Sequence, residues 1–376
     1  MAKFLFFSPH ALADSSSGAG LCVSTMLGVL TKLGHTCAAV TGSLIDGPNP
    51  LFAKAVEGPP TGSLKIGLSG QDLPVHKVNF HGAAHYIASF DSPSPLELRA
   101  SEKVGLRKLF LDIFEQLDPD VLLTYGGFVS NYFAGQHALS KGRTSVLNVA
   151  SDSYLKGDAH RFDHVNMIHT VSQALRAELD KVTTLPKVVT QTFVNREDVT
   201  AKTHTPEFIT FINPIAVKGV KIAAKIATEC QRLDKPYKFL FVEGRATRES
   251  LFAMCPELHG LPNLSIASNT SNVSKIYERT AACLYPSVYL EAAGRVAIEA
   301  NANGIPVLAC PAGGIPEMLD GAGFLFDPPE GQWANNLADV PAAYVTPWIE
   351  TLDRLHNEAA FMSDAQARAK AADARY

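Results

Sequence analysis

The sequence predicts an α/β protein made of two domains, each built on a doubly wound parallel sheet. The chain has 376 residues, which is too long for one typical core and suits two cores of about 150 to 200 residues each. Short apolar runs bounded by turn residues alternate with longer helical patterns, as in strand–helix–strand units. Open sheets of this kind bind ligands beyond the carboxyl ends of their strands, so we expect the site in a cleft between the domains.

The first half begins with a crossover unit. An apolar strand at 3–8 leads to a helix at 21–33, which Gly34 ends, and then to a strand at 36–41, which Gly42 closes. Residues 43–100 are rich in Gly, Pro and Ser, so we interpret them as a decorated region of the first domain with strand candidates at 75–80 and 85–90. The other elements expected in this half are helices at 102–117 and 172–181, a helix opened by Gly126-Gly127, and strands at 121–124, 145–149 and 167–171.

The second half repeats this rhythm after a polar, aperiodic stretch at 194–206, where we place the domain change. The first domain is therefore predicted at 1–198 and the second at 199–358. Six strands are expected in the second domain, at 208–212, 237–242, 264–267, 282–285, 306–309 and 323–326. The end of the chain is rich in Ala, Arg and Lys and predicts surface helices, and we expect the helix at about 359–376 to pack back on the first domain.

Composition argues against several classes of protein. Apolar residues make up 46% of the chain and the net charge is −4, so we expect a folded protein that does not bind nucleic acid. The six cysteines are scattered, and Asp152, His160, His164 and His169 match no familiar ligand spacing, so we expect reduced, buried thiols and no metal site. No stretch is apolar enough for a spanning helix or a signal-peptide core, which predicts a cytoplasmic protein with at most peripheral membrane contact.

The stretch 287–319 places two glutamates, Glu291 and Glu299, around a predicted helix start at Gly294. Backbone N–H groups at a helix start bind anions, and a glycine leaves them accessible to a phosphate. A carboxylate beside a phosphate is repelled unless it accepts hydrogen bonds from hydroxyls of the same ligand, so the pair favours a ligand that carries both phosphate and hydroxyl groups. The simpler alternative is that Glu291 caps the helix and Glu299 is a surface residue.

Several motifs give the chain a resemblance to a known family. Residues 291–300 read EAAGRVAIEA and are followed by GIPV at 304–307 and GGIPE at 313–317. This run resembles the E-x7-E signature of retaining GT-B glycosyltransferases of glycosyltransferase family four. Similar to the same family are FINPIAVKG at 211–219, VEGR at 242–245, GAG at 18–20, LGH at 33–35 and HTVSQALRAEL at 169–179. The resemblance is strong for 208–326, moderate for 1–42 and 118–181, and weak for 43–117.

The resemblance implies a GT-B fold of two facing Rossmann-like domains around a cleft, the first binding the acceptor and the second the donor. It implies transfer of a sugar, with retention at the anomeric carbon, from a nucleotide-sugar to a hydroxyl of a glycan, glycolipid or small molecule, as in polysaccharide or glycoconjugate biosynthesis. Neither a cofactor nor an essential metal ion is implied. By the same resemblance Glu291 contacts the donor sugar, Glu299 the ribose hydroxyls and Lys218 the diphosphate. The other donor-binding positions it implies are Gly18, Gly20, Asn213, Ala293, Gly294, Arg295 and Val296.

One departure from the family concerns the phosphate site. The family usually has an arginine five residues before the lysine, where this chain has Asn213. Preorganised cations stabilise the charge that develops on a leaving diphosphate, so another group has to replace the arginine. Our candidate is Arg245, at the end of the next predicted strand, with Arg248 or Arg295 behind it. The alternative is that Arg245 is a solvated loop residue.

A second departure lies in the first domain. Many relatives carry a histidine just after the strand at 121–124, where this chain has Tyr125. A histidine-dependent step at that point is therefore not assumed, and Tyr125 either contacts a sugar or belongs to the core. The roles of His81 and His85, in the region of weak resemblance, stay open.

Three other functions fit parts of the sequence. The Gly18-x-Gly20 pair occurs in dinucleotide-binding dehydrogenases, but there it follows the strand directly and a third glycine comes after it. A sugar epimerase or inverting transferase of the same fold needs a placed general base and does not require the two glutamates. A nucleotide-sugar-binding protein or assembly partner without turnover would fit Asn213 and the missing histidine, whereas Glu291, Glu299 and Lys218 argue against it.

Overall fold

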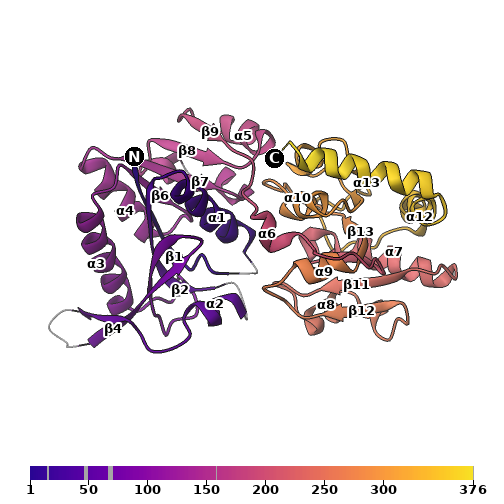
Figure 1. The fold of residues 1–376 in the computed structure, drawn as a ribbon, viewed down its shortest axis with the longest axis horizontal. Coiled ribbons are helices and arrows are strands. Elements are labelled where there is room, and N and C mark those ends of the chain that lie inside the picture. Colours follow the sequence, from indigo (N-terminus) through magenta and orange to yellow (C-terminus); the bar gives the residue numbers. More distant parts are fainter. Residues whose placement is uncertain (15–16, 46–49, 67–70, 158, 376) are drawn as a thin grey trace. The chain divides into compact units, whose positions relative to one another are not determined.

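The computed structural model describes residues 1–14, 17–45, 50–66, 71–157 and 159–375, and the chain divides into two compact units (Figure 1). The first unit comprises Met1–Val171 and Arg176–Phe193, and the second comprises Ser172–Leu175 and Val194–Tyr376. The sequence predicts a single change at 198/199. In the structure, the chain passes into the second unit at Val194, and the short segment Ser172–Leu175 also packs with that unit.

Within the described residues, the first unit carries a nine-stranded sheet (Figure 1). Its strands are β1 (Lys3–His10), β2 (Thr36–Leu44), β3 (Gly62–Ile66), β4 (Gln71–Phe80), β5 (Ala83–Ala88), β6 (Val121–Thr124), β7 (Thr144–Val149), β8 (Met167–Thr170) and β9 (Lys187–Val189). Its helices are α1 (Gly18–Lys32), α2 (Pro50–Ala55), α3 (Ala100–Leu117), α4 (Val129–Ser140) and α5 (Gln173–Asp180), with short 3-10 helices η1 (Asp152–Leu155) and η2 (Ala159–Phe162). Helix α5 starts in the segment that packs with the second unit.

The strand order of this sheet is β3-β4-β5-β2-β1-β6-β7-β8-β9. From β5 to β9 the neighbours pair in parallel, which confirms the doubly wound core that the sequence predicts. Strand β4 departs from this pattern and pairs antiparallel with both β3 and β5. A two-residue turn at His81 and Gly82 joins β4 to β5, and its φ angles of 53° and 87° suit a tight hairpin.

Helices cover both faces of the first sheet. Leu5 and Phe7 of β1 belong to a core cluster with Phe110 of α3. Phe6, between them in the strand, belongs to a second cluster with Val23 of α1. Successive side chains of a strand point to opposite faces, so β1 is buried on both sides, as an unbroken apolar run predicts.

The second unit is built on a smaller sheet. Its strands are β10 (Phe208–Ile212), β11 (Lys238–Val242), β12 (Leu264–Ala267), β13 (Thr280–Tyr285), β14 (Val307–Ala309) and β15 (Phe324–Leu325). Its helices are α6 (Arg196–Val199), α7 (Val220–Arg232), α8 (Arg248–Met254), α9 (Ser274–Glu278), α10 (Arg295–Ala302), α11 (Ile315–Leu319), α12 (Ala342–Asn357) and α13 (Ala359–Asp373), with 3-10 helices η3 (Ala216–Lys218) and η4 (Pro256–Leu258).

The strand order of the second sheet is β12-β11-β10-β13-β14-β15, and its neighbouring strands pair in parallel. The chain therefore moves outward from β10 to β12, returns to the other side of β10 at β13, and moves outward again. Ligands of such sheets bind where the order reverses, beyond the carboxyl ends of the two central strands. In this unit that point lies between the loops that follow β10 and β13.

The C-terminal helices α12 and α13, in yellow in Figure 1, belong to the second unit. Helix α13 packs against α10, α11 and α12 of the same unit. Its stripe of small buried residues, Ala365, Ala369 and Ala372, permits this close packing. Arg196 Nε also donates to Asp373 Oδ1 at 3.0 Å and ties α13 to α6. That the last helix also packs on the first domain, as the sequence predicts, stays a prediction.

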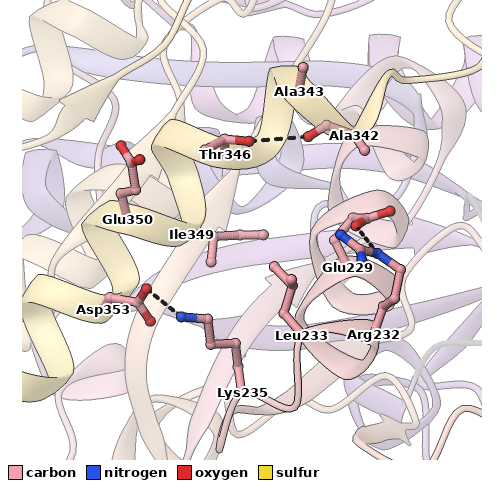
Figure 2. Close-up of a pocket in the computed structure, with 10 residues that line it drawn as sticks. All are labelled: Glu229, Arg232, Leu233, Lys235, Ala342, Ala343, Thr346, Ile349, Glu350 and Asp353. Atoms are coloured by element: carbon pink, nitrogen blue, oxygen red, sulfur yellow. Dashed lines mark hydrogen bonds and ion pairs between the residues drawn. The ribbon is translucent and has the colours of Figure 1, made fainter.

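A cavity of about 280 Å³ lies between the end of α7 and α12 (Figure 2). Charged residues on its wall pair with each other. Lys235 Nζ donates to Asp353 Oδ2 at 2.6 Å, and Arg232 Nε donates to Glu229 Oε2 at 2.6 Å. The Lys235–Asp353 pair links the end of α7 to α12, whereas the Arg232–Glu229 pair lies within α7. These contacts give the cavity a structural explanation.

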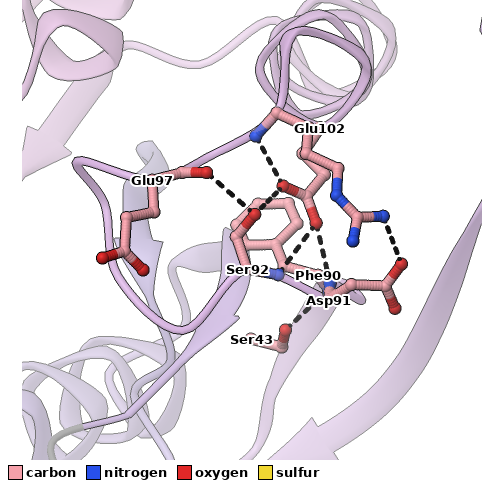
Figure 3. A network of polar contacts seen from close by, with 7 residues as sticks. Ser43, Phe90, Asp91, Ser92, Glu97 and Glu102 are labelled. Carbon is pink, nitrogen blue, oxygen red and sulfur yellow. Dashed lines mark hydrogen bonds and ion pairs between the residues drawn. The ribbon is translucent and has the colours of Figure 1, made fainter.

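A buried carboxylate organises the segment before α3 (Figure 3). Glu102 is 4% exposed and accepts hydrogen bonds from the backbone N–H groups of Asp91, Ser92 and Arg99 at 2.7, 3.1 and 2.8 Å. The Ser92 hydroxyl donates at 2.5 Å to Oε2, which also accepts from the Arg99 N–H, whereas the N–H groups of Asp91 and Ser92 donate to Oε1. Burial tends to raise the pKa of Glu102, but the hydrogen bonds from Ser92, Arg99 and Asp91 outweigh burial and the pKa is lowered.

All six cysteines are free and buried, as the sequence predicts. Burial raises the pKa of the Cys230 and Cys255 thiols to about 12, so the reactive thiolate is scarce at neutral pH. Across the described residues, every helix falls short of the length and hydropathy that crossing a bilayer requires.

Candidate functional site

The loop after β10 carries Lys218 and is locked to the loop after β13. Gly219 follows Lys218 with φ 79°, and a Cβ at Gly219 would lie 1.9 Å from the carbonyl oxygen of Pro286. Only glycine fits so close to another backbone. The Val288 N–H also donates to the carbonyl oxygen of Val217 at 2.9 Å. The two loops at the reversal of the sheet therefore form one rigid piece.

Lys218 and Glu291 meet at this point. Lys218 Nζ donates to Glu291 Oε1 at 2.5 Å, and the lysine and glutamate side chains are 18% and 5% exposed. Two hydroxyls complete the shell of the carboxylate, with Ser287 Oγ donating to Oε1 at 2.5 Å and Tyr289 Oη to Oε2 at 2.9 Å. Charge-assisted hydrogen bonds in a partly buried setting hold both charges in place. The structure thus brings together two of the predicted site residues.

Aromatic rings surround the lysine. Lys218 Nζ lies 4.9 Å from the ring centroid of Tyr289 and 5.6 Å from that of Tyr285. Burial, followed by the charge of Glu291, raises the pKa of Tyr285 far above its ordinary value, so its hydroxyl stays protonated. A cation held between rings and a carboxylate keeps its orientation, which suits a group that has to meet an anion.

The backbone beside Glu291 is also fixed. The Gly314 N–H donates to the Glu291 carbonyl oxygen at 2.8 Å, and a Cβ at Gly313 would lie 2.2 Å from that oxygen. The Ser172 hydroxyl donates to the next carbonyl oxygen, that of Ala292. The GG pair at 313–314 is therefore required by close approach to the Glu291 segment.

Glu299 lies on α10, which starts after Gly294 (φ 108°). It is 5% exposed, so it is not the surface residue of the simpler alternative. Arg295 Nε donates to Glu299 Oε1, and Tyr277 Oη donates to Oε2 at 2.8 Å. Burial, and after it the charge of Glu299, raises the pKa of Tyr277 well above its ordinary value. Ala293, next to Gly294, is buried, and Val296 is partly buried.

Asn213 and Arg245 also meet, but through the backbone of the arginine. Asn213 Oδ1 accepts from the Arg245 N–H at 2.9 Å. Asn213 adopts φ 59°, a left-handed conformation that asparagine tolerates better than most residues. The carboxamide thus holds the loop after β11, and a Cβ at Gly244 would lie 2.8 Å from the same oxygen. The Arg245 residue itself is exposed.

In the first unit, Gly18 and Gly20 lie at the start of α1, where the Ser17 hydroxyl accepts from the Gly20 N–H at 3.2 Å. Tyr125 follows β6, and its carbonyl oxygen accepts from Asn131 Nδ2 at 2.9 Å. The next N–H, that of Gly126, donates to the buried Tyr154 hydroxyl at 2.6 Å. These bonds fix the loop at which the family resemblance implies a histidine.

The histidines considered in the sequence have separate surroundings. His169 bonds to Asn148 Oδ1 at 2.5 Å and Thr190 Oγ1 at 2.6 Å, and burial lowers its pKa to about 4. His164 packs against the ring of Tyr132, with centroids 4.1 Å apart. Burial, followed by Coulombic repulsion from His81, lowers the pKa of His85 to about 4.

Ser287, Tyr289 and Tyr277 are functional candidates that sequence reasoning does not single out. Ser287 and Tyr289 stand four and two positions before Glu291, and this closeness is the one signal that could have found them. Tyr277 contacts Glu299 from 22 positions away in the chain, and no local pattern indicates such a contact.

Comparison with known proteins identifies the domain that carries the Lys218–Glu291 pair. Residues 194–342 match the family model Glycosyl transferases group 1. The second unit therefore carries a glycosyl transferases group 1 domain. This group 1 domain contains both loops of the Lys218–Glu291 pair and the whole of α10.

A curated relative matches part of the chain, and two solved structures have a similar fold. D-inositol 3-phosphate glycosyltransferase of Mycolicibacterium vanbaalenii is 38% identical over 105 residues, a match that covers 27% of this chain and 23% of the relative. The structure of a glycosyltransferase from Rickettsia africae has a TM-score of 0.67 at 15% identity and covers 100% of this chain and 93% of its own. Anabaena HepE in complex with UDP and glucose has a TM-score of 0.68 at 14% identity, with coverage of 100% and 94%.

At such low identity the solved structures show the fold alone. They confirm the α/β fold with two parallel-sheet domains that the sequence predicts, here with a group 1 domain as the second. The relative shares only about a quarter of its length with this chain. We therefore infer the roles of individual residues in the group 1 domain from their geometry and chemistry.

Proposed function

We propose that the protein is a glycosyltransferase that moves a sugar from a nucleotide-sugar donor to a hydroxyl acceptor. The observation that carries the proposal is the Lys218–Glu291 pair, 2.5 Å apart at the reversal point of the sheet in the group 1 domain. A nucleotide-sugar offers both charges a partner. Its diphosphate would take the ammonium of Lys218, and hydroxyls of its sugar would donate to the carboxylate of Glu291.

The proposed reaction is a displacement at the anomeric carbon with retention. The acceptor hydroxyl attacks on the face from which the diphosphate leaves, and the departing phosphate takes the proton. The chain's own groups position the donor and stabilise charge, with Lys218 on the leaving diphosphate and Glu291 on the sugar. We assign the ribose hydroxyls to Glu299 and propose that the reaction needs no metal ion. Binding of the acceptor by the first unit belongs to the same proposal.

A thermal-shift panel tests the donor. The protein is heated with UDP, ADP, GDP and their common sugar conjugates, and unfolding of the second unit is followed by fluorescence of Trp333 and Trp348, the chain's two tryptophans. A ligand at about 100 times its Kd stabilises a fold by about 2.7 kcal/mol, which raises the midpoint measurably. No shift with any member of the panel would contradict the proposal. A shift without consumption of the sugar conjugate, across a panel of acceptors, would favour a binding protein without turnover.

A further inference from the structure

Arg295 and Glu299 form a second ion pair in the group 1 domain. Arg295 Nε donates to Glu299 Oε1, and the side chains are 18% and 7% exposed. Tyr277, which is fully buried, donates to the other oxygen of Glu299 at 2.8 Å. The carboxylate is thus held on one side by a neutral hydroxyl and on the other by a guanidinium at the first position of α10.

Helix stability does not explain the placement of Arg295. The N-terminus of a helix carries partial positive charge, so a cation at its first position is unfavourable. At a separation of four residues, a glutamate stabilises a helix more when it precedes the basic residue than when it follows it. Arg295 precedes Glu299, so both rules oppose the arrangement. A residue that breaks local rules without local gain is expected at a functional site.

We propose that Arg295 is the second cation of the diphosphate site and supplies the charge that is missing at Asn213. The inference rests on the proposed function. Arg295 directly follows Gly294, so its backbone begins the helix whose N–H groups are expected to receive the phosphate, and its guanidinium bonds to Glu299 on the same helix. Lys218 bonds to Glu291, four positions before Arg295 in the chain. Each cation is therefore paired with a carboxylate of the same short segment.

The structure favours Arg295 over Arg245 for this role. Arg295 is partly buried and held in an ion pair, whereas Arg245 is exposed and its N–H is the group that Asn213 binds. A preorganised cation in a less polar setting stabilises developing charge more than a solvated one. A guanidinium carries five N–H donors, so Arg295 can turn to a diphosphate while Glu299 accepts from ribose hydroxyls.

This exchange couples the two halves of the ligand. A diphosphate draws Arg295 away from Glu299, and the ribose diol supplies the hydrogen bonds that the buried carboxylate then needs. A ligand with only one of these groups leaves a buried charge without its partner, which is costly. We assign Arg295 to the β-phosphate, the group that a nucleoside monophosphate lacks. Loss of Arg295 should therefore bring the affinities for nucleoside diphosphate and nucleoside monophosphate closer together.

The test is titration calorimetry with the nucleoside diphosphate that gives the largest thermal shift among UDP, ADP and GDP, and with the matching monophosphate. We expect Arg295→Gln to lower the ratio of the two affinities at least about tenfold, the scale of a lost charge-assisted hydrogen bond. Arg295→Lys keeps a cation beside Glu299, retains the fold, and gives an intermediate ratio. Arg232→Gln removes another arginine–glutamate pair of the same unit, on α7, and leaves the ratio at the wild-type value.

Two other outcomes would contradict the role of Arg295, and a third would contradict the proposed function. If the wild-type protein binds and Arg295→Gln weakens both nucleotides equally, Arg295 only supports Glu299 and the inference fails. It also fails if Arg245→Gln lowers the ratio and both Arg295 variants leave it unchanged. If the wild-type protein binds no nucleotide, the proposed function fails and takes this inference with it.

Discussion

Lys218 Nζ lies 2.5 Å from Glu291 Oε1, although the two residues are 73 positions apart in the chain. They meet because β10 and β13 are neighbours in the sheet and their following loops are interlocked at Gly219. The pair joins a cation suited to phosphate and a carboxylate suited to hydroxyls at the place where sheets of this topology bind ligands.

Removing either member of the pair should abolish most turnover. Lys218→Ala and Glu291→Ala are each expected to lower sugar transfer at least about 100-fold, the scale on which lost electrostatic groups act. Release of nucleoside diphosphate from the preferred donor measures the effect. Lys235→Ala, in the pair with Asp353 beside α12, is the matched control and should keep transfer near the wild-type rate. Near wild-type rates in both site variants would contradict the assignment.

Gly219 should tolerate no side chain. A Cβ there meets the Pro286 carbonyl at 1.9 Å in addition to the strain of φ 79°. Gly219→Ala is expected to cost about 2–5 kcal/mol, since overpacking adds about 1–3 kcal/mol to a left-handed penalty of about 1–2 kcal/mol. Urea unfolding followed by tryptophan fluorescence measures it. Gly260→Ala isolates the left-handed penalty, because Gly260 has φ 74° and a Cβ added there would meet no atom within 4 Å. Equal costs for the two variants would show that the loops are not locked.

Restoring an arginine at Asn213 should not improve the site. Asn213→Arg replaces a residue that tolerates φ 59° and removes the acceptor for the Arg245 N–H. We expect a loss of about 1–2 kcal/mol of stability and no gain in nucleoside diphosphate affinity. Asn213→Gly keeps the backbone conformation and removes only the acceptor, so it separates the two effects. An affinity gain of tenfold in Asn213→Arg would mean that the site lacks a cation and would argue against Arg295.

Glu102 should make the first unit sensitive to acid. Its pKa is lowered in the fold, so its contribution is present above the ordinary pKa of a glutamate, about 4.3, and is lost as the pH falls through the lower folded value. Glu102→Gln is expected to cost roughly 1–3 kcal/mol at pH 7, because the amide nitrogen that replaces one carboxylate oxygen cannot accept the two hydrogen bonds made to that oxygen. The calorimetric difference from wild type should stay constant from pH 7 to about 5 and shrink below about 4. Glu97→Gln changes an exposed neighbour and should match wild type.

The sequence predicts most of the second sheet. The bounds of β10 and β12 agree with the expected 208–212 and 264–267. Strand β10 is almost fully buried and appears as a short, mostly apolar run, whereas β12 lies at the edge of the sheet and is only partly buried. The antiparallel direction of β4 was not predictable, since a His-Gly turn is not among the usual hairpin signals. The packing of α13 against α10 and α11 was not predictable either. Its buried residues are alanines, which form a less hydrophobic stripe than larger apolar side chains would.

The candidate site was predictable in its charges and not in its contacts. Spacing and resemblance single out Lys218, Glu291 and Glu299, and the structure brings the first two together. Hydrophobic periodicity carries no signal for a pairing such as Glu299 with Tyr277, which joins α10 to α9 across 22 positions of the chain. The catalytic and binding roles of these residues stay predictions.

The most direct test of the central claim compares two ligands on one variant. Calorimetry would measure the affinity of wild type and Glu291→Ala for the preferred nucleotide-sugar and for the nucleoside diphosphate that it contains. Because we assign Glu291 to the sugar hydroxyls, the variant should lose at least about tenfold in affinity for the nucleotide-sugar and much less for the nucleoside diphosphate. Equal losses for both ligands, or unchanged affinity for the nucleotide-sugar, would contradict a donor-sugar site at Glu291.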